Sequence, residues 1–122
     1  MTDAEHAELS RQVALAIGYA PESVRVVTRW VSDKHDICEI YRTHRYAAPN
    51  GPDSWHPFDY RDPTVALPLL KWLCESYDGD VMYVRRKWHA SSIAVDPIQV
   101  IEVADTLEEA IARAVLAVKG GV

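Results

Sequence analysis

Helix and strand signals follow one another closely between Trp55 and Val122, and their order constrains the fold more than any other feature. Asp62-Pro63 joins a helix-capping side chain to a proline suited to the first helical turn, and a broad apolar face follows. Thr106-x-x-Glu109 is a capping box for an alanine-rich closing helix. Apolar, β-branched runs between the two helices predict strands. No catalytic signature interrupts this half of the chain.

The strands of this half are expected at 81–84, 88–95 and 98–103, with a turn at 85–87. Pro68 lies early in the preceding helical pattern and removes a backbone donor. The regular part of that helix is therefore expected to begin only near Leu67.

The first half of the chain predicts a helix and a hairpin. Thr2-x-x-Glu5 is a capping box, and the apolar face that follows ends at Gly18. Strands are expected at 24–31 and 37–41, around a turn at 32–35. Prolines and glycine punctuate 43–61, which favours an irregular loop, although its aromatic residues favour packing against the protein.

The element order is therefore helix, two strands, helix, two or three strands, helix (α-β-β-α-β-β-(β)-α). Short connections favour antiparallel neighbours. We expect an α+β fold with one mainly antiparallel sheet of four to five strands, covered by three helices. The length of 122 residues and an aromatic-rich central loop favour a single domain over 1–122.

Composition restricts the partners and the compartment. The net charge of −5 opposes non-specific binding to nucleic acid, which depends on cations that release counterions. No apolar run is long enough to span a membrane, and the acidic start is unlike a signal peptide. These features predict a soluble cytoplasmic protein. Two cysteines, Cys38 and Cys74, are too few for a disulfide framework and are expected to be reduced and at least partly buried.

The densest set of metal-ligand types lies in and after the first hairpin. A zinc site normally uses two separated pairs of close ligands, whereas this region offers one loose pair. A polar turn beside a buried cysteine explains the pattern better, so we predict neither a metal site nor a cofactor. The residues concerned are Asp33, His35, Asp36, Cys38 and His44.

Either cysteine could serve as a nucleophile if a histidine lay beside it. Cys74 falls among Leu70, Leu73 and Tyr77, where a small buried residue is expected. No acid–base pair stands out from the background, and we predict that the protein is not an enzyme.

Two groups of residues are candidates for binding. Cations and an aromatic ring at the 85–89 turn suit phosphate contact and base stacking, but they also suit a solvated turn. Aromatic residues of the loop suit either packing or an interface, and we expect packing for most of them, with one or two exposed to a partner or at a homodimer contact. The candidates are Arg85, Arg86, Lys87 and Trp88 for nucleic acid, and Trp55, Phe58 and Tyr60, with Tyr46 beside them, for a protein partner.

Three stretches of the chain resemble the phage α-β-α sandwich domain family, small proteins of bacteriophages and prophages. The resemblance covers roughly residues 2–19 and 55–119, and 24–50 shows no feature that aligns. The first stretch is Val13-Ala14-Leu15-Ala16-Ile17-Gly18-Tyr19. The second is Phe58-Asp59-Tyr60-Arg61-Asp62-Pro63-Thr64-Val65-Ala66-Leu67, together with the helix that continues into Trp72-Leu73 and the hairpin around Trp88. The third is Ala104-Asp105-Thr106-Leu107-Glu108-Glu109-Ala110-Ile111-Ala112-Arg113-Ala114.

The resemblance implies a compact phage-encoded domain without an assigned activity, and it carries no functional residues. We therefore predict a small non-enzymatic phage or prophage protein in the bacterial host cytoplasm. It would act through contacts with a host or phage protein and modulate a host system. The alternative is a nucleic-acid-binding accessory protein that uses the 85–89 turn.

Overall fold

The chain forms two compact units, Met1–Asp59 and Tyr60–Val122, joined just after a short strand. The computed structural model describes residues 2–30, 33–41, 55–92 and 100–119. The predicted α+β class is confirmed, since both units combine helices with antiparallel strands. Whether the units make up one domain is not tested by this division, and the single domain stays a prediction.

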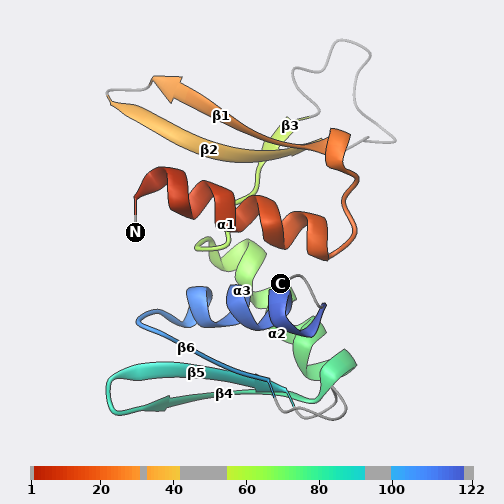
Figure 1. Cartoon of the computed structure of the whole chain (residues 1–122), viewed down its shortest axis with the longest axis vertical. Helices are drawn as coiled ribbons and strands as arrows, with labels where there is room; N and C mark the ends of the chain where they lie inside the picture. The colour runs from red at the N-terminus through yellow and green to blue at the C-terminus, as the bar shows by residue number, and fades with distance from the viewer. Residues whose placement is uncertain (1, 31–32, 42–54, 93–99, 120–122) are drawn as a thin grey trace. The chain divides into compact units, whose positions relative to one another are not determined.

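The first unit is a helix on a three-stranded antiparallel sheet of order β1-β2-β3 (Figure 1). Helix α1 packs on β2 and on β1. The sheet face toward α1 contributes Val24, Cys38 and Ile40, all of them buried. The elements are α1 (Asp3–Ala16), a 3₁₀ turn η1 (Pro21–Ser23), β1 (Val24–Trp30), β2 (Lys34–Tyr41) and β3 (Trp55–Pro57).

Local signals set both ends of α1. The Thr2 hydroxyl accepts a hydrogen bond from the Glu5 amide at 3.2 Å, as the capping box predicted. Gly18 follows the helix with φ of 113°, a conformation that a residue with a Cβ rarely adopts.

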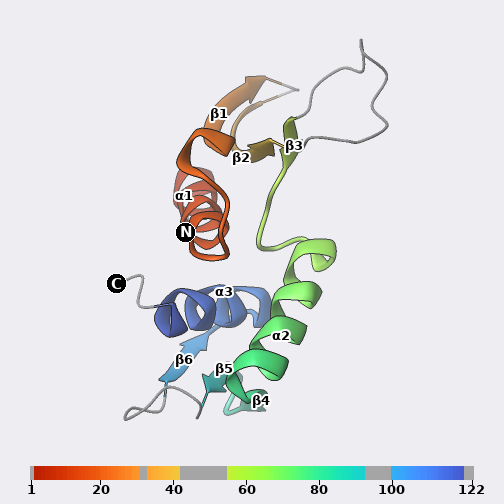
Figure 2. The same ribbon diagram turned by 90° about the vertical axis from the view of Figure 1, so that its right-hand side faces the viewer.

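The second unit has both of its helices on one face of the sheet β4-β5-β6, as Figures 1 and 2 show. Helix α3 packs on β5, β6 and α2, and α2 packs on β4. Its core joins Leu73 of α2, alanines of β5, β6 and α3, and Val118. The elements are α2 (Pro63–Tyr77), β4 (Gly79–Val84), β5 (Lys87–Ser92), β6 (Val100–Ala104) and α3 (Leu107–Val118).

Side-chain caps begin both helices at the predicted positions. The Asp62 carboxylate accepts from the Thr64 amide at 3.0 Å, and the Thr106 hydroxyl accepts from the Glu109 amide at 3.2 Å. Helix α2 begins at Pro63 and not near Leu67. An exposed proline one turn and a half into a helix loses one hydrogen bond, and here the helix runs through Pro68.

The sheet organisation differs from the prediction. Two three-stranded sheets replace the single sheet of four to five strands, because β2 pairs with β3 and not with a strand beyond α2. The strand β3 lies inside the stretch 43–61 that we expected to be irregular. In the first hairpin, Lys34 and His35 belong to β2, where they pair with Trp30 and Arg29, and not to the turn. The expected strand ends at 93–95 and 98–99 lie outside the described residues.

Candidate functional site

The aromatic residues 55–60 divide between surface and interior. Trp55 is half-buried on β3, where its ring lies 5.5 Å from that of Tyr41 and the Arg25 guanidinium lies 4.0 Å from its centroid. Phe58 and Tyr60 are buried, and Phe58 meets the ring of Tyr19 edge-on at 6.1 Å. Buried rings offer little area to a partner, so Trp55 is the one of these three that a partner can reach. Tyr46 lies outside the described residues.

An ion cluster lies beside Trp55 on the sheet face away from α1. The carboxylate of Glu39 accepts from Arg25 on the neighbouring strand at 3.0 Å and from Arg29 at 3.1 Å. Glu39 is buried although it is charged, because the two guanidinium groups and the strands cover it. Both arginines are paired with Glu39, so their charges are largely neutralised within the sheet. This face therefore offers little charge to a ligand.

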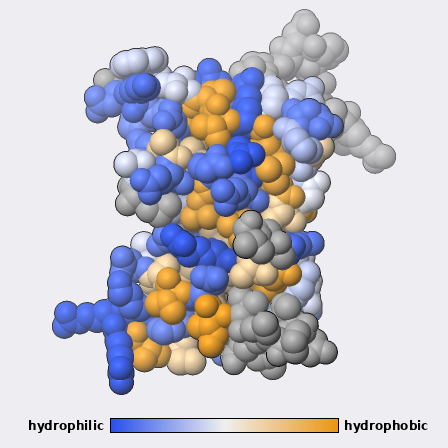
Figure 3. Space-filling view, viewed as in Figure 1, coloured by the Kyte–Doolittle hydropathy of each residue, from blue (hydrophilic) through white to orange (hydrophobic). Residues whose placement is uncertain are grey.

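The basic turn is divided in a similar way. Lys87 pairs with Asp105, and the Trp88 ring packs against the core at 4.9 Å from Tyr83. Only Arg85 and Arg86 extend freely, and neither makes an ion pair within the part of the chain that the structure describes. Figure 3 shows hydrophilic side chains projecting at this turn. The expected combination of cations with a stacking ring is therefore reduced to two arginines.

The residues that flank β4 have an unusual backbone. Asp78 before the strand and Arg85 and Arg86 after it have φ of 49°, 53° and 65°, and they are the non-glycine residues with positive φ in the described ranges. Val84 pairs with Lys87, so the two arginines form a two-residue turn with positive φ at both positions. Asn-Gly is the usual sequence for such a turn.

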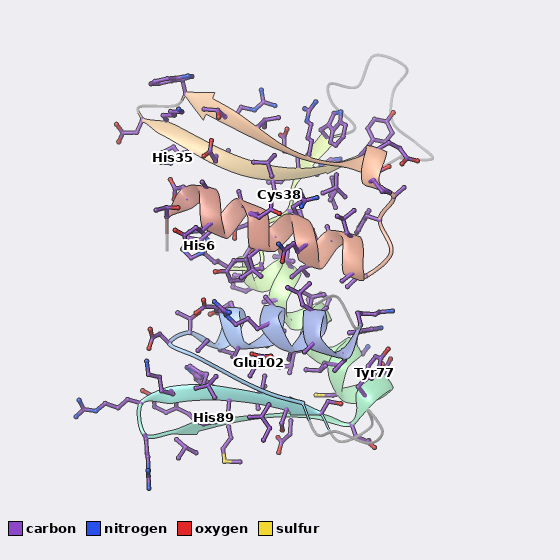
Figure 4. All side chains as sticks on the ribbon, in the orientation of Figure 1. His6, His35, Cys38, Tyr77, His89 and Glu102 are labelled. Atoms are coloured by element: carbon purple, nitrogen blue, oxygen red, sulfur yellow. The ribbon has the colours of Figure 1, made fainter. Side chains whose placement is uncertain are left out.

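The possible metal ligands of the first hairpin are not brought together. Figure 4 shows His35 and Cys38 well apart along β2. His35 Nδ1 lies 3.1 Å from an Asp3 carboxylate oxygen, and Asp36 accepts a hydrogen bond from Thr28. Within the described residues, no three His, Cys, Asp or Glu side chains are grouped as a metal ion needs, and His44 lies outside them.

The two cysteines differ in their burial, and the buried one is a weak nucleophile. Burial raises the pKa of the Cys38 thiol to about 11, so the thiolate is scarce at neutral pH. Cys74 is exposed, contrary to the expectation that it is at least partly buried. The apolar stripe of α2 directs Ala66, Leu69 and Leu73 inward and leaves the next residue outside.

A surface that the sequence did not single out lies on the face of the second sheet opposite its helices. Val81, Trp88 and Ala90 pack toward the helices, so the alternate residues face away. We call these the outward face, and its middle row aligns Met82, His89 and Val103 across the three strands. Its exposed large apolar residues are Met82, Val84, Ile101 and Val103.

A sequence signal for this face does exist. Residues 81–84 are four consecutive apolar residues, whereas a strand with one face in water needs apolar residues only at alternate positions. Ile101 and Val103 alternate with Glu102 and Ala104, and Ala104 is buried. Ile101 and Val103 have the apolar character of core residues, yet they point outward. The residue of β6 that packs against α3 is Ala104.

None of the helices in the described ranges is long and apolar enough to cross a membrane. Comparison with protein-family models, with curated proteins and with solved structures gives no match to this chain.

Proposed function

We propose that this is a non-enzymatic phage or prophage protein that works in the cytoplasm of the bacterial host by binding another protein. The observation that supports the proposal best is the outward face of the second sheet. Four large apolar side chains are exposed there on β4 and β6, the two outer strands of the sheet, and exposed apolar residues on one face favour binding of a protein.

The composition of the face suits a protein partner. Met82 has a flexible, polarisable side chain that adapts to different contacts, and His89 adds a polar group in the middle row. Asp80 and Lys87 lie at opposite ends of the same face, where they add polar groups to the apolar side chains of β4 and β6. A host or phage protein is the proposed partner, and modulation of a host system is the proposed consequence.

The test compares capture of bacterial proteins by three forms of the tagged chain. Ile101→Lys places a charge on the outward face, whereas Leu67→Lys places the same charge on α2 at a nearly equal exposure of 58% against 54%. We expect a partner that the wild type and Leu67→Lys retain after nuclease treatment and that Ile101→Lys loses. Circular dichroism checks that each variant is folded. A partner retained equally by all three forms would contradict the proposed surface.

The alternative is binding of nucleic acid by the 85–89 turn, which Arg85 and Arg86 favour because both are exposed and neither has an ion pair within the described residues. Two arginines would contact few phosphates, so the binding would be weak and would fall only moderately as salt rises. Retention on immobilised DNA or RNA that falls as salt rises, and that Arg85→Gln with Arg86→Gln abolishes, would support this alternative. Retention that stays the same as salt rises, or that stays the same in the double variant, would rule this alternative out.

A further inference from the structure

We propose that β4 pairs antiparallel with the β4 of a second copy of this chain, so that two three-stranded sheets become one sheet across a two-fold axis. This inference goes beyond the function proposed above, because it uses the edge of the sheet and leaves the outward face open. It would also bring two outward faces side by side in one assembly.

The first argument is the character of the edge. Strand β4 is the outer strand of its sheet, and three consecutive residues at its end, Met82, Tyr83 and Val84, are exposed. Natural edge strands are usually protected by charges, prolines or bulges. Between Gly79 and Val84 the only charge is Asp80, and there is no proline. An apolar edge of this kind favours strand addition.

The second argument is the charge at the two ends of β4. Asp78 and Asp80 lie at its start, and Arg85 and Arg86 follow its end. A two-fold axis sets the start of one β4 beside the end of the other. Pairing centred on Met82 sets Val81 opposite the partner's Tyr83 and Asp78 opposite the partner's Arg86. Each such contact occurs twice.

The other edges lack this complementarity. Strand β1 carries Arg25 and Arg29 and no acidic residue, so pairing centred on Val27 would set Arg25 opposite the partner's Arg29. The only charge in β6 is Glu102, which would face its own copy. Like charges directly opposite each other destabilise a strand pair. Strand β4 instead has acidic residues at its start and basic residues just after its end, so pairing with a second copy brings opposite charges together.

The third argument is the turn itself. Arg85 and Arg86 occupy positions with positive φ, where Asn and Gly would be more stable. Backbone strain persists at functional positions when the side chains there serve a purpose, and here that purpose would be an ionic contact with a partner. Neither arginine has an ionic partner within the described part of its own chain, and the proposed dimer supplies carboxylates from the partner's Asp78 and Asp80.

The first experiment measures the mass of the purified chain by sedimentation over a range of concentrations. We expect a monomer–dimer equilibrium. Arg85→Asn with Arg86→Gly suits the turn, so the variant folds, and loss of the charges should raise the dimer dissociation constant about tenfold. Asp78→Lys should weaken the dimer, and adding Arg86→Asp should restore it, because the two positions lie opposite each other across the two-fold axis. A wild-type monomer at every concentration, or a charge exchange without restoration, would overturn the proposal.

The second experiment tests the register. With Met82 on the axis, its Cα lies about 4.5–5.5 Å from that of the partner's Met82, which suits a disulfide. In a Cys74→Ser background, Met82→Cys should form a covalent dimer on mild oxidation. Ile101→Cys is the matched control, because Ile101 is 54% exposed and Met82 is 55% exposed. Equal cross-linking of the two variants would refute the β4 contact. A wild-type chain that captures its partner protein but forms no dimer would refute this inference and leave the proposed function standing.

Discussion

Replacement of Gly79 by alanine should destabilise the second unit through a collision with α2. A Cβ built on Gly79 would lie 2.7 Å from Leu73 Cγ and 2.9 Å from both the carbonyl carbon and oxygen of Leu73, whereas ordinary contacts begin at 3.4 Å. Leu73 is fully buried, and its carbonyl accepts the Asp78 amide that ends α2. Neither the side chain nor the backbone can therefore move away freely.

The magnitude follows from this close approach. Overpacking of a well-packed core costs about 1–3 kcal/mol. For a unit of this size, each kcal/mol lowers the melting temperature by roughly 4–8 °C. Gly79→Ala should therefore reduce the free energy of unfolding by about 1–3 kcal/mol in urea titrations, with Trp72 and Trp88 as fluorescent reporters.

Gly18→Ala is the matched control in the first unit. Its Cβ would meet nothing within 4 Å, and only its φ of 113° opposes the change. We expect a cost of about 1 kcal/mol there, from conformation alone, and no effect on the second unit. If Gly79→Ala left the unfolding midpoint of the second unit unchanged, the close packing of β4 on the end of α2 would be wrong.

Three further predictions concern the turn, a cap and the thiols. Arg85→Asn with Arg86→Gly should raise the free energy of unfolding by about 1–2 kcal/mol in urea, because it relieves two left-handed residues, whereas lysine at both positions keeps the charge and the backbone strain and should change nothing; an equal gain in the lysine variant would refute relief of strain as the cause. Thr106→Ala should lower the free energy of unfolding by about 1 kcal/mol in thermal unfolding, because α3 loses its cap, and Thr106→Ser should keep most of that stability. An alanine variant as stable as the wild type would show that the cap does not stabilise α3. Cys74 should react with a maleimide at neutral pH and Cys38 should not, because burial raises the pKa of Cys38 to about 11. The unfolded chain releases that proton at lower pH, so the stability gained from the neutral thiol is present below the usual thiol pKa and is lost as pH rises toward 11. Rapid labelling of both thiols would contradict the burial of Cys38. So would an unfolding midpoint of the first unit that stays constant as pH rises toward 11.

Helix boundaries were the most predictable feature, because each depends on a few neighbouring residues. Thr2, Asp62 and Thr106 cap their helices as their side chains predicted, since a cap needs only a hydroxyl or carboxylate within reach of an amide two or three residues ahead. The effect of Pro68 was overestimated, because a proline exposed near a helix start costs a single hydrogen bond and packing elsewhere along α2 compensates.

The candidate site was far less predictable. Phe58 and Trp55 are both aromatic and three residues apart, yet one is buried and the other half-exposed. Trp88 follows three cations in the sequence, but its ring faces the core while Arg85 and Arg86 are exposed to solvent. The direction of a side chain on a strand depends on which face is covered, and composition does not contain that information.

The sequence alone determined the α+β class, the order of most helices and strands, and the charge of each segment, because these follow from local propensity, capping and periodicity. Tertiary structure decided that the strands form two sheets, that Cys74 is outside, and that apolar residues of β4 and β6 face away from the helices. Strand pairing joins residues far apart in the chain, so each choice of partner and covered face depends on the whole packing of a unit.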